Sequence, residues 1–374
     1  MQSRYHAGKA GGKGWLAHLA RAVLALSMVV LAGCADTRYY WQSVTGHLQV
    51  MQAAKPLDDW LADPQTPDGL KQRLTLAHEI RQFAITQLQL PDNASYHRYA
   101  SLTRRYVVWN VVAAPEFSLT LKTWCFPVAG CVGYRGYFSE SDAQAEATRL
   151  REFGLEAGVY GVPAYSTLGW MNWLGGDPLL STFVNYPDGE LARMLFHELS
   201  HQVLYVADDT VFNESFATAV ERLGGEVWLQ QQASPQARAD YLVFNTRRQQ
   251  FRALTRSTRD RLTQIYANNS ALAQTNKALI AIKKAAMDEF RQGYEELKAS
   301  WGGYAGYDAW VAQANNAAFG AQAAYDDLVP AFEALFEREG RDWPRFYAAV
   351  KRLGQQDKTQ RTEHLRQLAT RPQG

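Results

Sequence analysis

Cysteine and surplus charge are both scarce in this sequence of 374 residues. Three cysteines occur, and 39 Lys and Arg residues nearly balance 37 Asp and Glu residues, which leaves a formal net charge of +2. Because a near-neutral chain has no basic surplus to attract phosphate groups, the composition gives no indication of a nucleic-acid partner. Internal repeats and long low-complexity linkers are also missing. The length suffices for one large domain, or for a catalytic domain with appendages.

Long apolar runs are limited to one, which lies near the start. Residues 22–31 follow a basic stretch, and they suit the core of a signal peptide better than a membrane span or a buried helix. The run leads into Leu-Ala-Gly-Cys34, which resembles the bacterial lipobox. This resemblance predicts that residues 1–33 are a lipoprotein signal peptide and that a lipid on Cys34 anchors the mature chain in a membrane. Because Ala35 rather than aspartate follows, the expected location is the outer membrane, facing the periplasm.

The other two cysteines, Cys125 and Cys131, lie close together in the sequence. Outside the cytoplasm the surroundings are oxidising, and two neighbouring cysteines are then typical of a small disulfide loop. A zinc site would need more ligands than this pair, and a redox-active pair is usually closer in sequence. We therefore predict a structural disulfide.

The chemically informative segment is His197-Glu-Leu-Ser-His201. Two histidines four residues apart lie on one face of a helix, where both imidazoles can bind one metal ion rather than pack in a core. Apolar residues flank the motif at the spacing of a helix, at Leu191, Leu195, Leu199 and Val203. Zn²⁺ suits two histidines and a carboxylate, and it can keep a fourth position open for water. Glu198 is then close enough to act on that water as a general base.

A second predicted helix follows a short acidic loop that contains Asp208 and Asp209, whose carboxylates are candidates for orienting the imidazoles. The apolar stripe of this helix is formed by Phe216, Val220, Leu223 and Val227. Glu214 and Glu221 share the opposite face. That face is either solvated or, if the helix lies between a core and a cleft, it offers a carboxylate to the metal.

The two segments together resemble the gluzincin metallopeptidases. Asn213-Glu-Ser-Phe-Ala is similar to the Asn-Glu-Gly-Phe-Ala pattern of the alanyl aminopeptidases, which also carry a glutamate seven residues after the ligand. The resemblance implies that Glu214 is the third zinc ligand and that Glu221 supports the site from behind. Counting from His201 leaves a rival, because Glu221 lies at the gap found in the thermolysin type.

The remaining pattern predicts an α+β fold that is mainly helical. Helices are expected between residues 39 and 90, with a break at Pro64-Gln-Thr-Pro67, and again at 141–153. Aromatic and β-branched residues predict strands at 106–112, 133–138 and 158–165. Residues 163–170 are the candidate for an edge strand that pairs with the substrate backbone, and an ordinary core strand is the alternative.

Beyond the second metal-site helix, residues 230–301 have the pattern of a long helical hairpin with its turn at Asn268-Asn-Ser270. The first arm is rich in arginine, which is typical of a solvated face or of contact with an anionic lipid surface. The gluzincin resemblance implies a zincin-like catalytic region at 34–230. The helical region at 231–374 is expected to pack on it.

The whole set of features also resembles a bacterial family of predicted aminopeptidases, over nearly all of the mature chain. The segments Trp-Cys-Phe-Pro, Tyr-Arg-Gly-Tyr-Phe, Ser-Thr-Leu-Gly-Trp and Asn315-Asn316 contribute to this resemblance. It implies a zinc-dependent peptidase with a zinc-activated water and Glu198 as general base. The oxyanion of the substrate needs a further donor, and Tyr307 in the Gly-rich segment after the hairpin is our candidate. Competing tyrosines are Tyr165, Tyr205 and Tyr304.

Three functional classes remain open. An aminopeptidase is favoured, but the alanyl aminopeptidases bind the free amine of the substrate through a Gly-x-Met-Glu-Asn strand, which this sequence lacks. The first alternative is an endopeptidase of periplasmic quality control. The second is a non-catalytic zinc-binding lipoprotein, although Glu198, which binds no metal, argues for chemistry. Apart from a peptide or protein substrate and the membrane, no partner is indicated.

If Cys34 carries the lipid, a Cys34→Ala protein should leave the membrane fraction, because burial of the acyl chains supplies the membrane affinity. Fractionation of cells that express the parent and the variant measures this. A variant that still sediments with membranes would show that another element anchors the chain.

Overall fold

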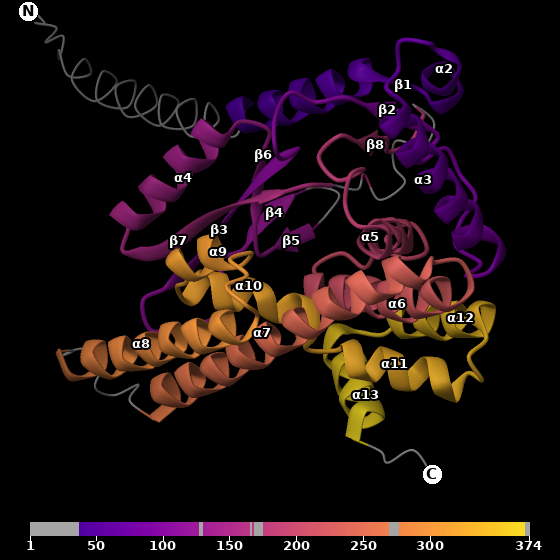
Figure 1. Ribbon diagram of the computed structural model, residues 1–374. Coiled ribbons are helices and arrows are strands. Elements are labelled where there is room, and N and C mark those ends of the chain that lie inside the picture. Colours follow the sequence, from indigo (N-terminus) through magenta and orange to yellow (C-terminus); the bar gives the residue numbers. More distant parts are fainter. Residues whose placement is uncertain (1–36, 127–129, 165–166, 168–174, 269–276, 371–374) are drawn as a thin grey trace, which may run out of the picture. The chain divides into compact units, whose positions relative to one another are not determined.

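The computed structural model describes residues 37–126, 130–164, 167, 175–268 and 277–370 (Figure 1). The chain divides into two compact units, 1–49 and Val50–Gly374. In the first unit the described residues are helical from residue 37 onward. The predicted signal peptide and Cys34 lie outside the described residues, so lipidation stays a prediction. Within the part of the chain that is described, no helix is both long and apolar enough to cross a membrane.

Helices make up most of the second unit, which confirms the prediction of a mainly helical α+β fold. The first helices are α2 (Leu57–Ala62), α3 (Asp68–Thr86), α4 (Glu140–Glu152), α5 (Asp188–Ser200) and α6 (Thr210–Gln231). The later helices are α7 (Pro235–Asn268), α8 (Lys277–Ser300), α9 (Asp308–Ala312), α10 (Asn316–Asp326), α11 (Val329–Arg338), α12 (Trp343–Gly354) and α13 (Lys358–Thr370). The expected break at 64–67 separates α2 from α3, which begins directly after Pro67.

In the described part of the chain, three small sheets complete the fold. The first sheet pairs β6 (Arg135–Tyr137), β3 (Val108–Pro115) and β7 (Leu155–Val162) in antiparallel fashion. The second contains β1 (Ala54–Pro56), β2 (Arg98–Ala100) and β8 (Leu179–Leu180), and the third contains β4 (Trp124–Phe126) and β5 (Gly130–Val132). The predicted strands correspond to the first sheet. The other strands were missed because two or three residues are too few to form a recognisable periodic pattern.

The central strand β3 is buried on both faces. Val112 and Ala114 pack with Ala317 of α10. Val111 and Ala113 point to the other face of the strand and are fully buried as well, and α4 also contacts β3. Burial on both faces explains why this strand is nearly all apolar and does not alternate with polar residues.

The helices α7 and α8 pack against each other as the predicted hairpin. They share a buried aromatic cluster with α10, formed by Phe251, Phe290, Tyr294 and Phe319. The predicted turn lies outside the described residues except for Asn268, and so does most of the candidate substrate strand at 163–170. The proposed domain boundary after residue 230 falls at the end of α6, inside the second unit, and stays a prediction.

The second unit builds its largest core around α6. Phe216 on this helix is fully buried, and its ring centroid lies 5.8 Å from that of Phe332 and 5.9 Å from that of Phe346. The helix α5 also packs along α6. Because α6 is enclosed in this way, the face that carries Glu214 and Glu221 is mostly buried rather than solvated, with side-chain exposures of 12% and 15%.

Replacing Phe216 with alanine should lower the free energy of unfolding by about 3–5 kcal/mol, because a large aromatic side chain leaves a cavity in a packed core. Urea denaturation monitored by circular dichroism measures the change. Phe153→Ala is the matched control, since Phe153 is 72% exposed and should shift the free energy by no more than about 0.5 kcal/mol. Equal losses in the two variants would contradict the placement of α6 in the core.

Candidate metal centre

The helix α5 carries His197 and Glu198 and ends at Ser200, one residue before His201. His201 is the C-cap residue and keeps a helical conformation, with φ −60° and ψ −18°. The two imidazoles therefore remain on one face, as their spacing predicts. The apolar pattern suggested that the helix continues to Val203, but the next two amide groups donate to carbonyls three residues back, as in a tight turn.

The loop between α5 and α6 is held by Asn213. The side-chain amide of Asn213 donates to the carbonyl of Val206 at 2.8 Å, and its oxygen accepts the amide of Val206 at 2.9 Å. Asp209 caps α6 by accepting the amide of Phe212. Asn213 thereby fixes the start of α6, and its neighbour Glu214 lies against the imidazoles.

Three donor atoms meet between the two helices. Nε2 of His197 lies 3.2 Å from Nε2 of His201 and 3.3 Å from Oε2 of Glu214, and the remaining distance, from His201 to Glu214, is 3.8 Å. All three side chains are buried, and together they could hold one metal ion. Ligand atoms about 2.0–2.2 Å from a tetrahedral zinc ion lie roughly 3.3–3.6 Å apart, so both the spacing and the donor types fit Zn²⁺.

Glu221 lies on the other side of the His197 ring. Its Oε2 is 3.0 Å from Nδ1 of His197, whereas the candidate metal position faces Nε2. Burial opposes ionisation of Glu221, but the Arg193 guanidinium and the hydrogen bond with His197 together outweigh burial and hold the pKa of that carboxyl well below its usual range. The carboxylate can therefore accept the Nδ1 proton of His197 and leave the lone pair of Nε2 for a metal. The geometry favours Glu214 over Glu221 as the third ligand.

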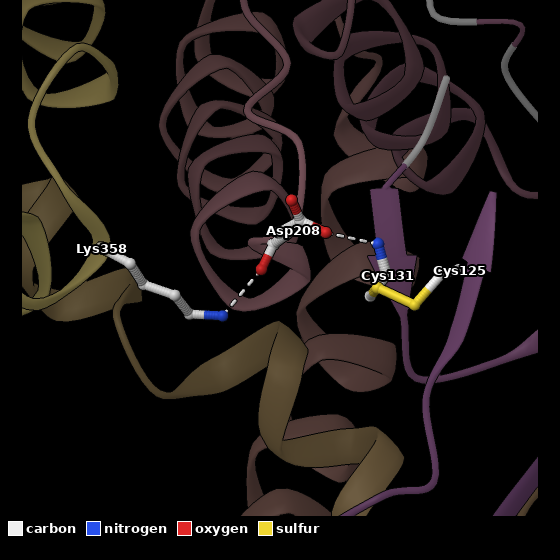
Figure 2. The surroundings of a disulfide bond; sticks show 4 residues. All are labelled: Cys125, Cys131, Asp208 and Lys358. Atoms are coloured by element: carbon white, nitrogen blue, oxygen red, sulfur yellow. Dashed lines mark hydrogen bonds between the residues drawn. A yellow bond between two sulfur atoms is a disulfide. The ribbon is translucent and has the colours of Figure 1, made fainter. Parts of the chain in front are cut away.

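The two aspartates of the loop make hydrogen bonds away from the imidazoles, and Figure 2 shows those of Asp208. The carboxylate of Asp208 accepts the amide of Cys131 at 2.6 Å, and its carbonyl accepts the Lys358 ammonium at 2.7 Å. Asp209 pairs with Arg361 of α13 at 2.6 Å. The expectation that these aspartates orient the imidazoles is therefore corrected, because they tie the loop to the β4–β5 hairpin and to α13.

The same hairpin contains the disulfide between Cys125 and Cys131, which pairs two residues directly opposite each other on β4 and β5. A disulfide across a short hairpin limits the conformations of the strands on both sides. The Cys131 amide that binds Asp208 is thus part of a restrained element. The Asp208–Cys131 hydrogen bond therefore links the α5–α6 loop to a hairpin whose strands are joined by a disulfide.

Glu198 is buried next to the candidate ligands without belonging to them. Burial raises the pKa of its carboxyl to about 7, His197 opposes this, and the negative charge of Glu214 adds to it. A bound divalent cation would lower this pKa again, because it favours the charged carboxylate. The side chain therefore lies where it can take up or release a proton beside the candidate ligands.

The structure places Tyr307 in the aromatic cluster of the hairpin, and its role as oxyanion donor stays a prediction. Its ring stacks on Phe251 with a centroid distance of 4.0 Å, as part of the hairpin's own aromatic cluster. Tyr304 lies in the same region, beneath the guanidinium of Arg247. Tyr165 lies outside the described residues. The Gly-rich segment that contains Tyr304 and Tyr307 has no periodic pattern, so the sequence did not predict where these rings would pack.

Four other tyrosines lie close enough to Glu214 for its charge to act on their phenols. In each of them burial raises the pKa of the phenol, and the negative charge of Glu214 contributes, for Tyr134, Tyr160, Tyr205 and Tyr325. Tyr325 of α10 also lies nearly parallel to the His197 ring, with 6.3 Å between centroids. Sequence reasoning named only Tyr205 of this group. The others come from the loop between β5 and β6, from β7 and from α10, and no local pattern connects them.

The structure is thus a mainly helical α+β protein with a buried group of two histidines and a glutamate that could hold a metal ion, and a further glutamate lies beside it. The model of the family described as "Putative aminopeptidase" matches residues 38–365, and the chain belongs to that family. The predicted membership is thereby confirmed, and the chain is a peptidase at the level of the family description. The comparisons with curated proteins and with solved structures give no match.

The two glutamates of α6 should behave differently when removed. If the centre binds zinc, Glu214→Ala should lose the ion on dialysis, because the two remaining histidines are too few ligands to retain it. Glu221→Ala should keep one zinc per chain but bind it about 10–100-fold more weakly, as for loss of a group that orients a ligand. Elemental analysis and chelator competition measure the two effects. Full occupancy in Glu214→Ala together with loss in Glu221→Ala would reverse the assignment.

Proposed function

We propose that this protein is a zinc-dependent peptidase of zincin-like architecture, and that aminopeptidase is its favoured activity. His197, His201 and Glu214 would hold Zn²⁺, and Glu198 would act as the general base. The observation that carries this proposal is the meeting of three buried donor atoms at 3.2–3.8 Å, with a protonatable carboxyl beside them. Membership in an aminopeptidase family supports peptide substrates.

When bound, the ion would supply Lewis-acid chemistry and lower the pKa of water from 15.7 to about 7. Glu198 accepts the proton of the attacking water and later delivers it to the leaving amine. A positioned base of this kind typically contributes about 10²–10⁴ in rate. Its burial keeps bulk water away, so the proton remains available for the amine.

Negative charge develops on the carbonyl oxygen of the substrate, and a neutral hydrogen-bond donor aimed at that oxygen stabilises it. The tyrosines around Glu214 suit this role, because burial and the nearby carboxylate keep their phenols protonated. Tyr325 and Tyr134 are therefore candidates beside Tyr307. The ring of Tyr325 also lies nearly parallel to the His197 ring.

An endopeptidase remains the alternative, because the chain lacks the Gly-x-Met-Glu-Asn segment that binds the substrate amine in alanyl aminopeptidases. Location at the periplasmic face of the outer membrane, through a lipid on Cys34, is part of the same proposal. The lipobox-like segment and the Cys125–Cys131 disulfide support an oxidising compartment.

Glu198→Gln should lower turnover by about 10² or more while zinc remains bound, because an amide of equal size cannot accept the proton. Substrate affinity should change little, since the lost interaction belongs to the transition state. Peptide hydrolysis and zinc content are measured on the same preparations. Full activity in the zinc-loaded variant would exclude this mechanism.

The same assay compares peptides that have a free amine with N-acetylated copies of identical sequence. Cleavage of the free-amine peptides alone identifies an aminopeptidase, and cleavage of both sets identifies an endopeptidase. No cleavage of either by the zinc-loaded parent protein would favour a non-catalytic zinc lipoprotein.

A further inference from the structure

A chain of charged side chains extends from His197 away from the candidate metal position. Glu221 accepts from Nδ1 of His197 through Oε2 and from the Arg193 guanidinium through Oε1. Arg193 lies one helical turn before His197 on α5, so both side chains lie on the same face of that helix. Glu221 comes from α6 and fills the space between them.

Arg193 is buried at 3% exposure, which is unusual for a charged side chain. Its Nε and one terminal nitrogen have no hydrogen-bond partner among the described residues. Gly225 of α6 leaves room for its stem, since a Cβ at Gly225 would lie 2.9 Å from the Cγ of Arg193. A buried ion pair is rarely more stabilising than apolar residues of similar size. Stability alone therefore gives no reason for an arginine at this position.

A second ion pair lies behind Arg193. Its guanidinium is 3.8 Å from Oε1 of Glu190 at the start of α5. Glu190 in turn accepts two hydrogen bonds from Arg248 of α7, at 2.9 and 2.6 Å. This fork-to-fork geometry is the strongest form of an arginine–carboxylate pair. The arginine-rich arm of the hairpin is thereby joined to α5, which it also contacts.

We propose that Arg193 is a positioning residue for the metal centre, and that Arg248 of α7 holds it in place through Glu190. This inference rests on the proposed zinc site. Arg193 fixes one oxygen of Glu221, so that the other oxygen holds the His197 ring with Nε2 directed at the metal. The hairpin arm α7 thereby contributes to metal affinity without contacting the metal.

The other histidine makes this support more important. Nδ1 of His201 is buried and has no hydrogen-bond partner in the described part of the chain. Only His197 is therefore held from behind by a carboxylate. If the contact between Glu221 and Nδ1 of His197 is lost, neither imidazole is oriented by a carboxylate behind it among the described residues.

The test measures the dissociation constant for Zn²⁺ of the purified full chain by competition with a chromophoric chelator. Arg193→Met should weaken binding about 10–100-fold, as expected for loss of a group behind a ligand. Arg248→Met, one step further out, should weaken it roughly 2- to 30-fold. The visible spectrum of the Co²⁺-loaded Arg193→Met protein should also shift, since it reports the ligand geometry.

Arg259→Met is the matched control for Arg248→Met. Arg259 lies on the same helix, pairs with Asp327 at 2.8 Å, and its side chain is 18% exposed, against 16% for Arg248. Among the described residues no hydrogen bond or ion pair joins Arg259 to Glu190, so zinc affinity should stay within twofold of the parent, about 0.4 kcal/mol. Arg193→Lys restores the charge, and its zinc affinity should lie between those of the parent and Arg193→Met.

The outcomes separate this inference from the proposed function. A parent chain that binds no zinc overturns both. A parent that binds zinc, with Arg193→Met and Arg248→Met within twofold of it, overturns the positioning role alone. Thermal unfolding of the metal-free proteins provides the structural readout, because a merely structural arginine would lower the unfolding midpoint and leave zinc affinity unchanged. If Arg193→Met does not fold, the zinc affinities of Arg248→Met and Arg259→Met are compared instead. Equal affinities would then overturn the positioning role.

Discussion

The packing of α5 against α6 is the constraint on which the rest of the structure depends. Both helices bring charged or titratable side chains into their shared interface, and isolated charges are costly to bury. His197 and Glu221 compensate each other across the interface, and Arg193 compensates the second oxygen of Glu221. The opposite side of α6 packs through Phe216 into the aromatic core. The helix therefore joins the core to the polar centre.

The α5–α6 loop needs support from both sides because it determines where Glu214 lies relative to the histidines. Asn213 closes the loop on itself, Asp208 binds the disulfide hairpin, and Asp209 pairs with Arg361 of α13. Asp208 has a positive φ of 65°, a strained conformation for a residue other than glycine. Its two hydrogen bonds hold it in that conformation. The C-terminal helix is consequently part of the support of the site.

Much of the fold and of the candidate site follows from local pattern. Helical periodicity located α4, α5, α6 and the α7–α8 hairpin, because a 3.6-residue period repeats several times in each of them. The strands of the second and third sheets were missed because each contains only two or three residues. Residues in loops and Gly-rich segments were harder to place: Tyr307 packs in the hairpin cluster, and Asp208 accepts a hydrogen bond from β5 of the third sheet.

The sequence by itself determined the relations that lie within a few residues: the shared face of His197 and His201, the pair Asn213 and Glu214, and the short Cys125–Cys131 loop. Helix geometry and short chain separation fix these contacts wherever the segment packs. Only the tertiary structure decided which side chains from other elements contact these residues. Arg248 and Glu190 are 58 residues apart, and Tyr325 meets His197 across two helices. Such contacts depend on how helices dock, and the periodicity of a single helix contains no information about its neighbour.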